Sequence, residues 1–197
     1  MTKYKGMLGA AAIFIASSLF SSAAYADWIL DAENSNISYG TVKNDMIGEN
    51  NTFKTISGHL NNDGQIDIEI DLSSIDTLIE IRDGRMRDIV FKVSENATAK
   101  LSGQMDLKAY DNQEIGTSRI IETTVSLELV GQKLEHDVKL LVTRLAKNKV
   151  MVTPHGVMFI DADDYDLVDA IEILRNLAGL DSIASVISMG FYLTFIK

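Results

Sequence analysis

Apolar and polar residues alternate strictly along residues 66–72. One side of this stretch carries Ile66, Ile68, Ile70 and Leu72, and the other carries Asp67, Glu69 and Asp71. A period of two is typical of a β-strand that buries one face and exposes the other. The pattern therefore predicts a strand with its isoleucines directed into a core.

Polar residues interrupt this pattern directly after Leu72. The interrupting side chains, which favour local backbone hydrogen bonds over a sheet ladder, are Ser73, Ser74, Asp76 and Thr77. A charged turn over 82–88 follows, and alternation of Ile89, Phe91 and Val93 predicts a return strand. We interpret the stretch as an apolar wall that ends in a polar, arginine-containing rim, as at the mouth of an apolar pocket.

Comparable alternation predicts strands along most of the remaining chain. The first predicted elements are an opening strand over 28–39 with a kink near Asn34, a polar loop over 43–51, a strand over 53–60 and a hairpin turn at 61–64. Strands over 97–107, 118–130 and 134–142 follow, and a final strand begins after 183. Residues 149–153 and 156–160 predict two short strands, with one bent strand as the alternative. Only one segment predicts a helix, from Tyr165, where apolar residues recur every three or four positions. Asp163 or Asp164 would cap its start, and Gly179 would end it.

This order of elements predicts an all-β fold, an extended antiparallel barrel of about eight strands with one helix near the C-terminus. The final strand is long enough to pair with the first, which would close the sheet and remove its exposed edges. A barrel of this size either fills its interior with side chains or holds one small ligand. A β-sandwich is the alternative architecture.

The first 26 residues have the pattern of a secretory signal peptide. Lys3 and Lys5 precede an apolar run, and Ala24-Tyr25-Ala26 provides a small-x-small cleavage site. We therefore expect a domain over 27–197 that is periplasmic or secreted and has no integral membrane segment after cleavage. An uncleaved N-terminal membrane helix is the alternative. The chain contains no cysteine, so packing and sheet hydrogen bonds must stabilise it without disulfides.

The chain is acidic, with a formal net charge of −10, and removal of Lys3 and Lys5 would leave the mature protein two units more negative. Such a charge repels phosphate backbones, and no basic cluster opposes it locally. Nucleic acid is therefore not an expected partner.

The sequence lacks the motifs of common catalytic sites. It has no cysteine nucleophile, Gly-x-Ser-x-Gly elbow, His-Glu-x-x-His motif or phosphate-binding glycine loop. Its three histidines are His59, His136 and His155; His136 has the apolar parity of its strand and is expected to be partly buried, whereas the other two lie near predicted turns. We predict no enzyme activity and no catalytic residues, with a serine–histidine–acid site assembled from distant residues as the alternative.

The densest acidic cluster superficially resembles a calcium-binding loop. Its members are Asp161, Asp163, Asp164 and Asp166, with Glu172 in the twelfth position. Tyr165 occupies a ligand position, however, and Asp166 stands where such a loop needs glycine. Acidic residues favoured by the dipole at a helix start explain the cluster better, so no metal site is predicted.

Three parts of the chain resemble the YceI-like family of secreted bacterial proteins. These parts are the opening Trp28-x-x-Asp31-x-x-x-Ser35-x-Ile37-x-Tyr39, the segment Ser74-Ile75-Asp76-Thr77 followed by Arg82-Asp83 and Arg87-Asp88-x-x-Phe91, and the helix Ile171–Leu180 before the last strand. The resemblance implies a lipocalin-like barrel that binds a long isoprenoid or other amphiphile inside, often as a dimer. Two features depart from the family pattern: 130–137 matches its glycine-containing hairpin only loosely, and Ala162–Tyr165 replaces its arginine-led Asp-Phe-Gly motif.

We therefore predict a hydrophobic ligand, an isoprenoid quinone, polyprenyl compound or fatty amphiphile, and no other cofactor. The candidate ligand-binding residues are Ile68, Ile70, Leu72, Phe91, Leu101, Met105, Val125, Leu127, Phe191 and Leu193 for the apolar lining, with Thr77 and Arg82 at the polar rim. Arg82 is a candidate anchor for a polar head group, and a surface pair with Asp83 or Asp88 is its alternative role. The expected function is to sequester or carry the lipid. A structural or protein-interaction module with a filled barrel, or an enzyme acting on such a lipid, are the alternatives.

Overall fold

The computed structural model describes residues 27–106, 110 and 112–197, and the predicted signal peptide lies outside the described residues. The strands are β1 (Trp28–Leu30), β2 (Asn36–Lys43), β3 (Ile47–Phe53), β4 (Ile56–Leu60), β5 (Gln65–Asp71), β6 (Ile75–Asp76), β7 (Thr98–Gln104), β8 (Ser118–Leu129), β9 (Gln132–Ala146), β10 (Lys149–Pro154), β11 (Met158–Asp161) and β12 (Val186–Ile196). The α-helices are α1 (Glu80–Arg85) and α3 (Val168–Ala178), and a π-helical turn over Met86–Val90 continues α1. Among these described helices, none is both long and apolar enough to cross a bilayer.

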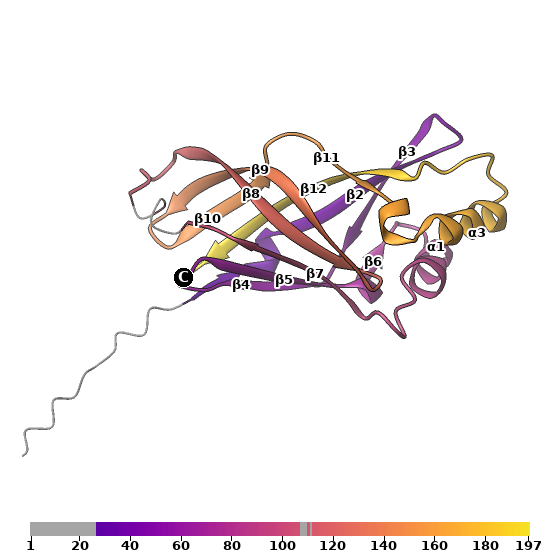
Figure 1. Cartoon of the computed structure of the whole chain (residues 1–197), viewed down its shortest axis with the longest axis horizontal. Coiled ribbons are helices and arrows are strands. Elements are labelled where there is room, and N and C mark those ends of the chain that lie inside the picture. The colour runs from indigo at the N-terminus through magenta and orange to yellow at the C-terminus, as the bar shows by residue number, and fades with distance from the viewer. Residues whose placement is uncertain (1–26, 107–109, 111) are drawn as a thin grey trace, which may run out of the picture.

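Eight of the described strands close into an antiparallel barrel. Their order is β1-β4-β5-β7-β8-β9-β10-β12, and β1 returns to β12 through the pairs Ile29↔Ile196 and Leu30↔Phe195. The predicted closed barrel is therefore confirmed, including the pairing of the last strand with the first. Figure 1 shows the C-terminus at the end of the barrel opposite to α1 and α3.

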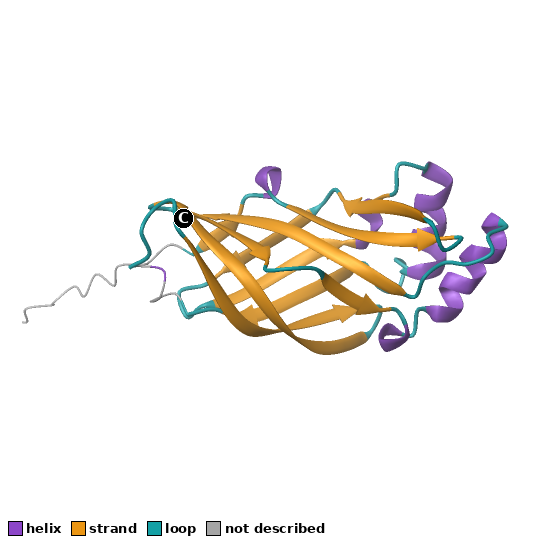
Figure 2. Ribbon diagram, turned by 90° about the horizontal axis from the view of Figure 1, so that it is seen from above, coloured by secondary structure: helices purple, strands orange, loops and turns teal. Residues whose placement is uncertain are grey.

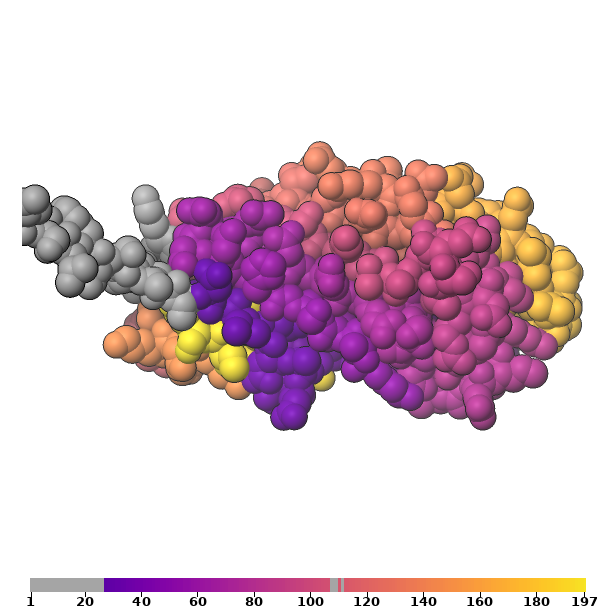
Figure 3. Space-filling model, turned by 90° about the horizontal axis from the view of Figure 1, so that it is seen from below, coloured from indigo at the N-terminus to yellow at the C-terminus, as the bar shows by residue number. Residues whose placement is uncertain are grey.

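A second sheet lengthens the barrel at the helical end. It contains β11, β12, β2, β3 and β6, and β12 belongs to both sheets because its two halves pair with different strands. The space-filling view shows the resulting elongated molecule, with the segment around α3 in yellow-orange at one tip (Figure 3). In Figure 2, α1 and α3 lie together at that tip, beyond the main body of strands. The interior of the closed barrel therefore continues along the long strands to the end of the molecule where the helices lie.

The predicted alternation of 66–72 is realised in β5. Ile68 and Ile70 are buried in the core, whereas Glu69 between them is exposed. The long β8–β9 hairpin turns at Val130 and Gly131, both with positive φ, which matches the right-handed twist of the flanking strands. The predictions of two short strands and a long final strand are also confirmed, by β10, β11 and β12.

The return strand predicted over 89–93 is wrong, as is the prediction of a single helix. The chain forms α1 and the π-helical turn there, and Met86 and Val90, four residues apart, both pack on the core. The Asp83 carboxylate accepts a 2.8 Å hydrogen bond from the Thr77 amide and another from the Thr77 hydroxyl. These bonds fold the charged segment back on itself, so it does not extend into a strand.

Three further predictions are corrected by the structure. Residues 43–51 are not a loop, because β2 and β3 form a hairpin with Lys43 opposite Ile47. The strand predicted over 53–60 is broken at 54–55, where the amides of Lys54 and Thr55 bond to Ser74, and its two parts join different sheets. Helix α3 begins at Val168 without a side-chain cap, since Asp163 and Asp164 lie in a preceding 3₁₀ turn. The helix end at Gly179, with φ of +64°, is confirmed.

Candidate functional site

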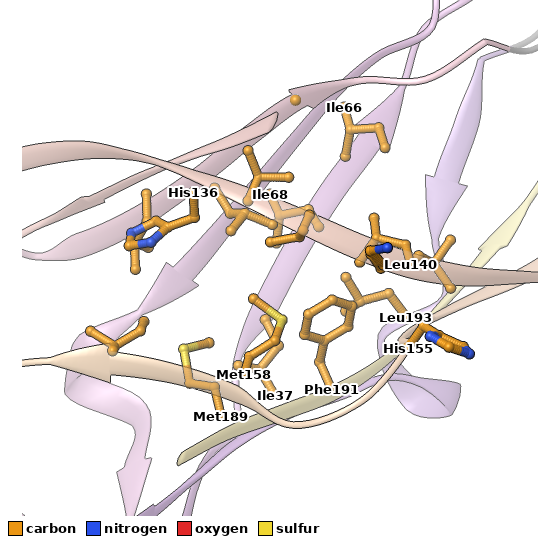
Figure 4. A pocket seen from close by; sticks show the side chains of 18 of the residues that line it. Ile37, Ile66, Ile68, His136, Leu140, His155, Met158, Met189, Phe191 and Leu193 are labelled. Carbon is orange, nitrogen blue, oxygen red and sulfur yellow. The ribbon is translucent and has the colours of Figure 1, made fainter. Parts of the chain in front are cut away.

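The interior contains two adjoining cavities, and the first lies within the closed barrel. This barrel compartment has a volume of about 350 Å³. Its apolar lining comprises Ile37, Ile66, Ile68, Ile70, Leu101, Val125, Leu127, Val138, Leu140, Val152, Val157, Met158, Phe159, Ile160, Met189, Phe191, Leu193 and Phe195. In the close-up of Figure 4, Ile68 and Leu140 lie across the cavity from Ile37, Met158 and Phe191. The cavity is mainly apolar and suited to hydrocarbon, although five polar side chains also line it: Ser102, His136, Asp137, Lys139 and His155.

The second cavity, the helical compartment, lies where the second sheet meets α1, the π-helical turn and α3. Its volume is about 530 Å³. Alternate residues of β2 and β3 form one wall, and Ile171, Leu174 and Leu177 of α3 form another. Polar side chains, among them Glu49 and Arg82, lie beside apolar ones here. The helical compartment therefore combines a large apolar wall with a pair of oppositely charged side chains.

The two compartments meet at a waist formed by residues that line both. These residues are Ile37, Ile70, Leu127, Ile160 and Met189. All five side chains are apolar and come from five different strands or their flanks. An elongated ligand that occupied both cavities would pass between them.

Both compartments reach the protein surface. Ile79, Ile81 and Leu177 line the helical compartment and are also exposed, Ile81 to 66 %, so its mouth lies between α1 and α3. The barrel compartment reaches the surface beside the connection before β11, where Val157 is 70 % exposed. Exposed apolar residues at a cavity mouth are the expected signature of a route for an apolar ligand.

A network of charged groups surrounds Arg82 in the helical compartment. Arg82 forms an ion pair with Glu49 through Nη1 and donates through Nη2 to the Thr77 carbonyl oxygen. Glu49 also accepts a 2.7 Å hydrogen bond from Lys43 Nζ. Burial favours a higher pKa for Glu49, but the hydrogen bonds from Lys43 and Arg82 outweigh it and hold the pKa below its usual range. Glu49 is therefore ionised at neutral pH, and the predicted pairing of Arg82 with Asp83 or Asp88 is replaced by a pair with Glu49.

A row of aromatic rings runs beside this network. The Tyr39 ring lies 5.9 Å from that of Phe53, and Phe53 lies 5.9 Å from Phe91, between ring centroids in both cases. These separations are typical of favourable aromatic pairs. All three rings line the helical compartment.

The structure brings eleven of the twelve candidate residues onto the two cavities. Ile68, Leu101, Val125, Phe191 and Leu193 line the barrel compartment, Leu72, Thr77, Arg82 and Phe91 line the helical compartment, and Ile70 and Leu127 line both. Met105 does not line either: its side chain is buried, and its amide donates a 2.7 Å hydrogen bond to the Gly64 carbonyl. Contact of these residues with a ligand stays a prediction.

Several cavity residues were missed from the sequence. Glu49, Asn51 and Phe53 alternate along β3 and all line the helical compartment, so a period-two signal was present. It was obscured because two of the three inward residues are polar. The apolar stripe of α3 was recognised, but only as a helix face that packs.

His136 and His155 line the barrel compartment, whereas His59 lies at the surface. Nε2 of His136 lies 2.7 Å from the Tyr165 hydroxyl, which agrees with the predicted partly buried histidine. His59 lies 3.8 Å from Asp67 at the surface. Within the described residues, no group of three metal-ligating side chains comes together.

Fold and cavities together define a lipocalin-like barrel, a closed antiparallel sheet around an apolar interior. The family model of the YceI-like domain matches residues 28–195. The chain therefore belongs to the YceI-like family.

Solved structures share this fold. A polyisoprenoid binding domain from Saccharophagus degradans implicated in plant cell wall breakdown is 32 % identical, with a TM-score of 0.85 over 86 % of this chain and 98 % of that one. BcnA from Burkholderia cenocepacia is 14 % identical, with a TM-score of 0.65 over 84 % and 98 % of the two chains. A Campylobacter jejuni YceI protein is 15 % identical, with a TM-score of 0.56 over 75 % and 84 %. No curated protein matches the sequence.

Proposed function

We propose that this chain is a periplasmic or secreted protein that binds an amphiphilic lipid with an isoprenoid tail, and sequesters or carries it. The observation that carries the proposal is the pair of adjoining compartments, both lined mainly by apolar side chains, with a network of ion pairs around Arg82 in the helical one. The similarity to the Saccharophagus degradans domain, a polyisoprenoid binding domain at 32 % identity, supports an isoprenoid as the cargo.

The free energy of binding comes from burial of the tail. Each methylene that moves from water into an apolar cavity contributes about 0.8 kcal/mol. A tail that crosses the waist gains this contribution in both compartments, while the head stays near the polar network of the helical compartment. Binding is therefore expected to strengthen with tail length until the barrel compartment is full.

The cavities favour a binding protein over the alternative of a filled-barrel interaction module, because a filled barrel would leave no room at its centre. An enzyme acting on the lipid would need a polar pair deep in the barrel compartment with a strongly shifted pKa. His136, which lines that compartment, is already hydrogen-bonded to the buried Tyr165. We therefore favour binding without chemistry.

The experiment is native mass spectrometry of protein purified from its own periplasm without detergent, followed by organic extraction. We expect one isoprenoid per chain, and a polypeptide mass equal to that of a chain that begins at Asp27. A bare polypeptide that stays unchanged after incubation with isoprenoid quinones and polyprenyl phosphates would refute the binding proposal. Retention of residues 1–26 would refute the export proposal separately.

A further inference from the structure

Two polar atoms in the helical compartment are buried and have no hydrogen-bond partner among the described residues. They are the hydroxyl of Tyr39 and Nε of Arg82, and both residues line this cavity. Buried polar atoms in folded proteins are nearly always paired, with protein, water or ligand. Two such atoms on one cavity indicate a place where a bound molecule supplies the missing partner.

The surroundings of Arg82 fix the direction of its free N–H. Its two terminal nitrogens are already engaged, Nη1 by Glu49 and Nη2 by the Thr77 carbonyl oxygen. Because a guanidinium group is planar and rigid, these two contacts also hold the Nε–H in place. Arginine nitrogens only donate hydrogen bonds, so the missing partner must be an acceptor.

Tyr39 supplies a second donor beside a row of aromatic rings. Burial is the main cause that raises the pKa of Tyr39 above its usual value, and the charges of Arg82 and Asp83 act on it in opposite directions. The hydroxyl is therefore protonated at neutral pH and can donate. Its ring is followed by those of Phe53 and Phe91, which are tilted by 36° and 48° between neighbours, and a flat group can stack on one of these ring faces.

The two cations nearest to these donors are already paired. Arg82 and Lys43 both contact Glu49, and the Asp83 carboxylate is bonded to Thr77. A dianionic head at the two donors would lie close to both carboxylates, which disfavours it. Arg85 also lines the compartment, and no ion pair of it occurs among the described residues, so an anion would be expected to use Arg85 instead.

We propose that the Tyr39 hydroxyl and the Arg82 Nε–H seat an uncharged head group that presents an acceptor oxygen on a flat unsaturated frame, such as a ring carbonyl. The tail then runs through the waist into the barrel compartment. This inference rests on the proposed function, because it assigns the head-group chemistry and the orientation of the same ligand.

The test uses three probes with one farnesyl tail: a farnesyl benzoquinone, farnesyl diphosphate and farnesene, which has no head group. Their affinities for the mature protein are measured by displacement of a fluorescent fatty probe. We expect the quinone to bind more tightly than farnesene and than the diphosphate. Tyr39→Phe, which keeps the ring and removes the hydroxyl, should weaken quinone binding about 3- to 10-fold and leave farnesene binding unchanged.

Tyr192→Phe is the matched control, because Tyr192 is 48 % exposed on β12 and lines neither compartment. It should leave all three affinities unchanged. Arg82→Lys, checked for folding by circular dichroism, keeps the charge but removes the planar fork and should reproduce the selective loss for the quinone.

The outcomes separate the inference from the function on which it rests. If the unmodified protein takes none of the three probes, the proposed function fails and the inference fails with it. If all three bind, but Tyr39→Phe changes quinone and farnesene equally, the lipid-binding function stands and the head-group assignment is overturned. A diphosphate that binds more tightly than the quinone, with the preference lost in Arg85→Gln, overturns it in the same way.

Discussion

The hydroxyl of Tyr165 lies 2.7 Å from Nε2 of His136, and the two rings stack with their centroids 6.3 Å apart. Tyr165 belongs to the 3₁₀ turn that leads into α3 and is fully buried, whereas His136 lies on β9 and lines the barrel compartment. This contact joins the segment before the helix to the barrel wall. It also engages one of the two histidines that line this compartment, the other being His155.

Removal of this hydrogen bond should weaken the fold measurably. Tyr165→Phe keeps the ring and is expected to lower the free energy of unfolding by about 1 kcal/mol, the usual worth of a buried hydrogen bond. Urea denaturation measures the change, with Tyr192→Phe as the exposed control. Equal stabilities of the two variants would show that the 2.7 Å contact contributes nothing to the fold.

Alkaline pH should destabilise the protein through its buried tyrosines. Burial, aided by the charge of Asp164, raises the pKa of Tyr165 to about 12, and burial also raises the pKa values of Tyr39 and Tyr110. Above about pH 10 these phenols ionise in the unfolded state first, which then binds fewer protons than the folded state. The contribution of these tyrosines to the free energy of unfolding is therefore complete below about pH 10 and is lost as the pH rises toward about 12. Urea denaturation across this pH range should show a falling free energy of unfolding, and the fall should be smaller for Tyr165→Phe. Parallel curves of stability against pH for the two proteins would show that Tyr165 does not contribute to the fall.

The turn before β5 requires glycine at position 64 for two reasons. Gly64 has φ of +87°, and a Cβ atom there would lie 1.9 Å from the Met105 carbonyl oxygen. Gly131 has a similar φ of +81° but nothing within 4 Å of such an atom. Gly131→Ala should therefore cost about 1 kcal/mol for the backbone conformation alone. Gly64→Ala should cost clearly more, because the backbone must also move, and equal losses in thermal or chemical unfolding would exclude the steric contribution.

A bulky side chain at the waist should shorten the tail that the protein accepts. Met189 lines both compartments, so Met189→Trp would narrow the passage between them. Exclusion of only about two methylenes from the barrel compartment corresponds to about a tenfold loss of affinity. Affinities for isoprenoid quinones of increasing tail length should therefore diverge from those of the unmodified protein as the tail grows. Met46→Trp, at a position 87 % exposed in the β2–β3 turn, is the control; the same length dependence in both variants would refute a passage at Met189.

The barrel was predictable because its strands obey simple rules. In β5, every second residue is apolar, and the alternation survives in the structure with Ile68 and Ile70 inside. The hairpin at Asn61–Gly64 and the stop at Gly179 use residues whose turn chemistry is specific. Closure followed from the length of the last strand, which does pair with β1.

The helical compartment was harder to predict because its features arise from contacts distant in sequence. Ile89, Phe91 and Val93 alternate over only three positions, which is too short to separate a strand from a helical turn. The deciding interaction, between Asp83 and Thr77, depends on where the chain turns. Glu49 looked like a loop residue, and only the fold places it against Arg82, 33 positions further along the chain.

The two compartments differ in how tightly their walls constrain the sequence. Backbone ladders fix the barrel compartment, so a change of length in one strand disturbs its neighbours on both sides. Much of the helical compartment's wall comes from α1, the π-helical turn and α3, which lie outside those ladders. Substitutions in these helical segments are therefore able to change the wall of the helical compartment, the proposed place of the head group, without altering the pairing of the barrel strands. Relatives of this chain would then diverge in the polar part of their cargo sooner than in its hydrocarbon part.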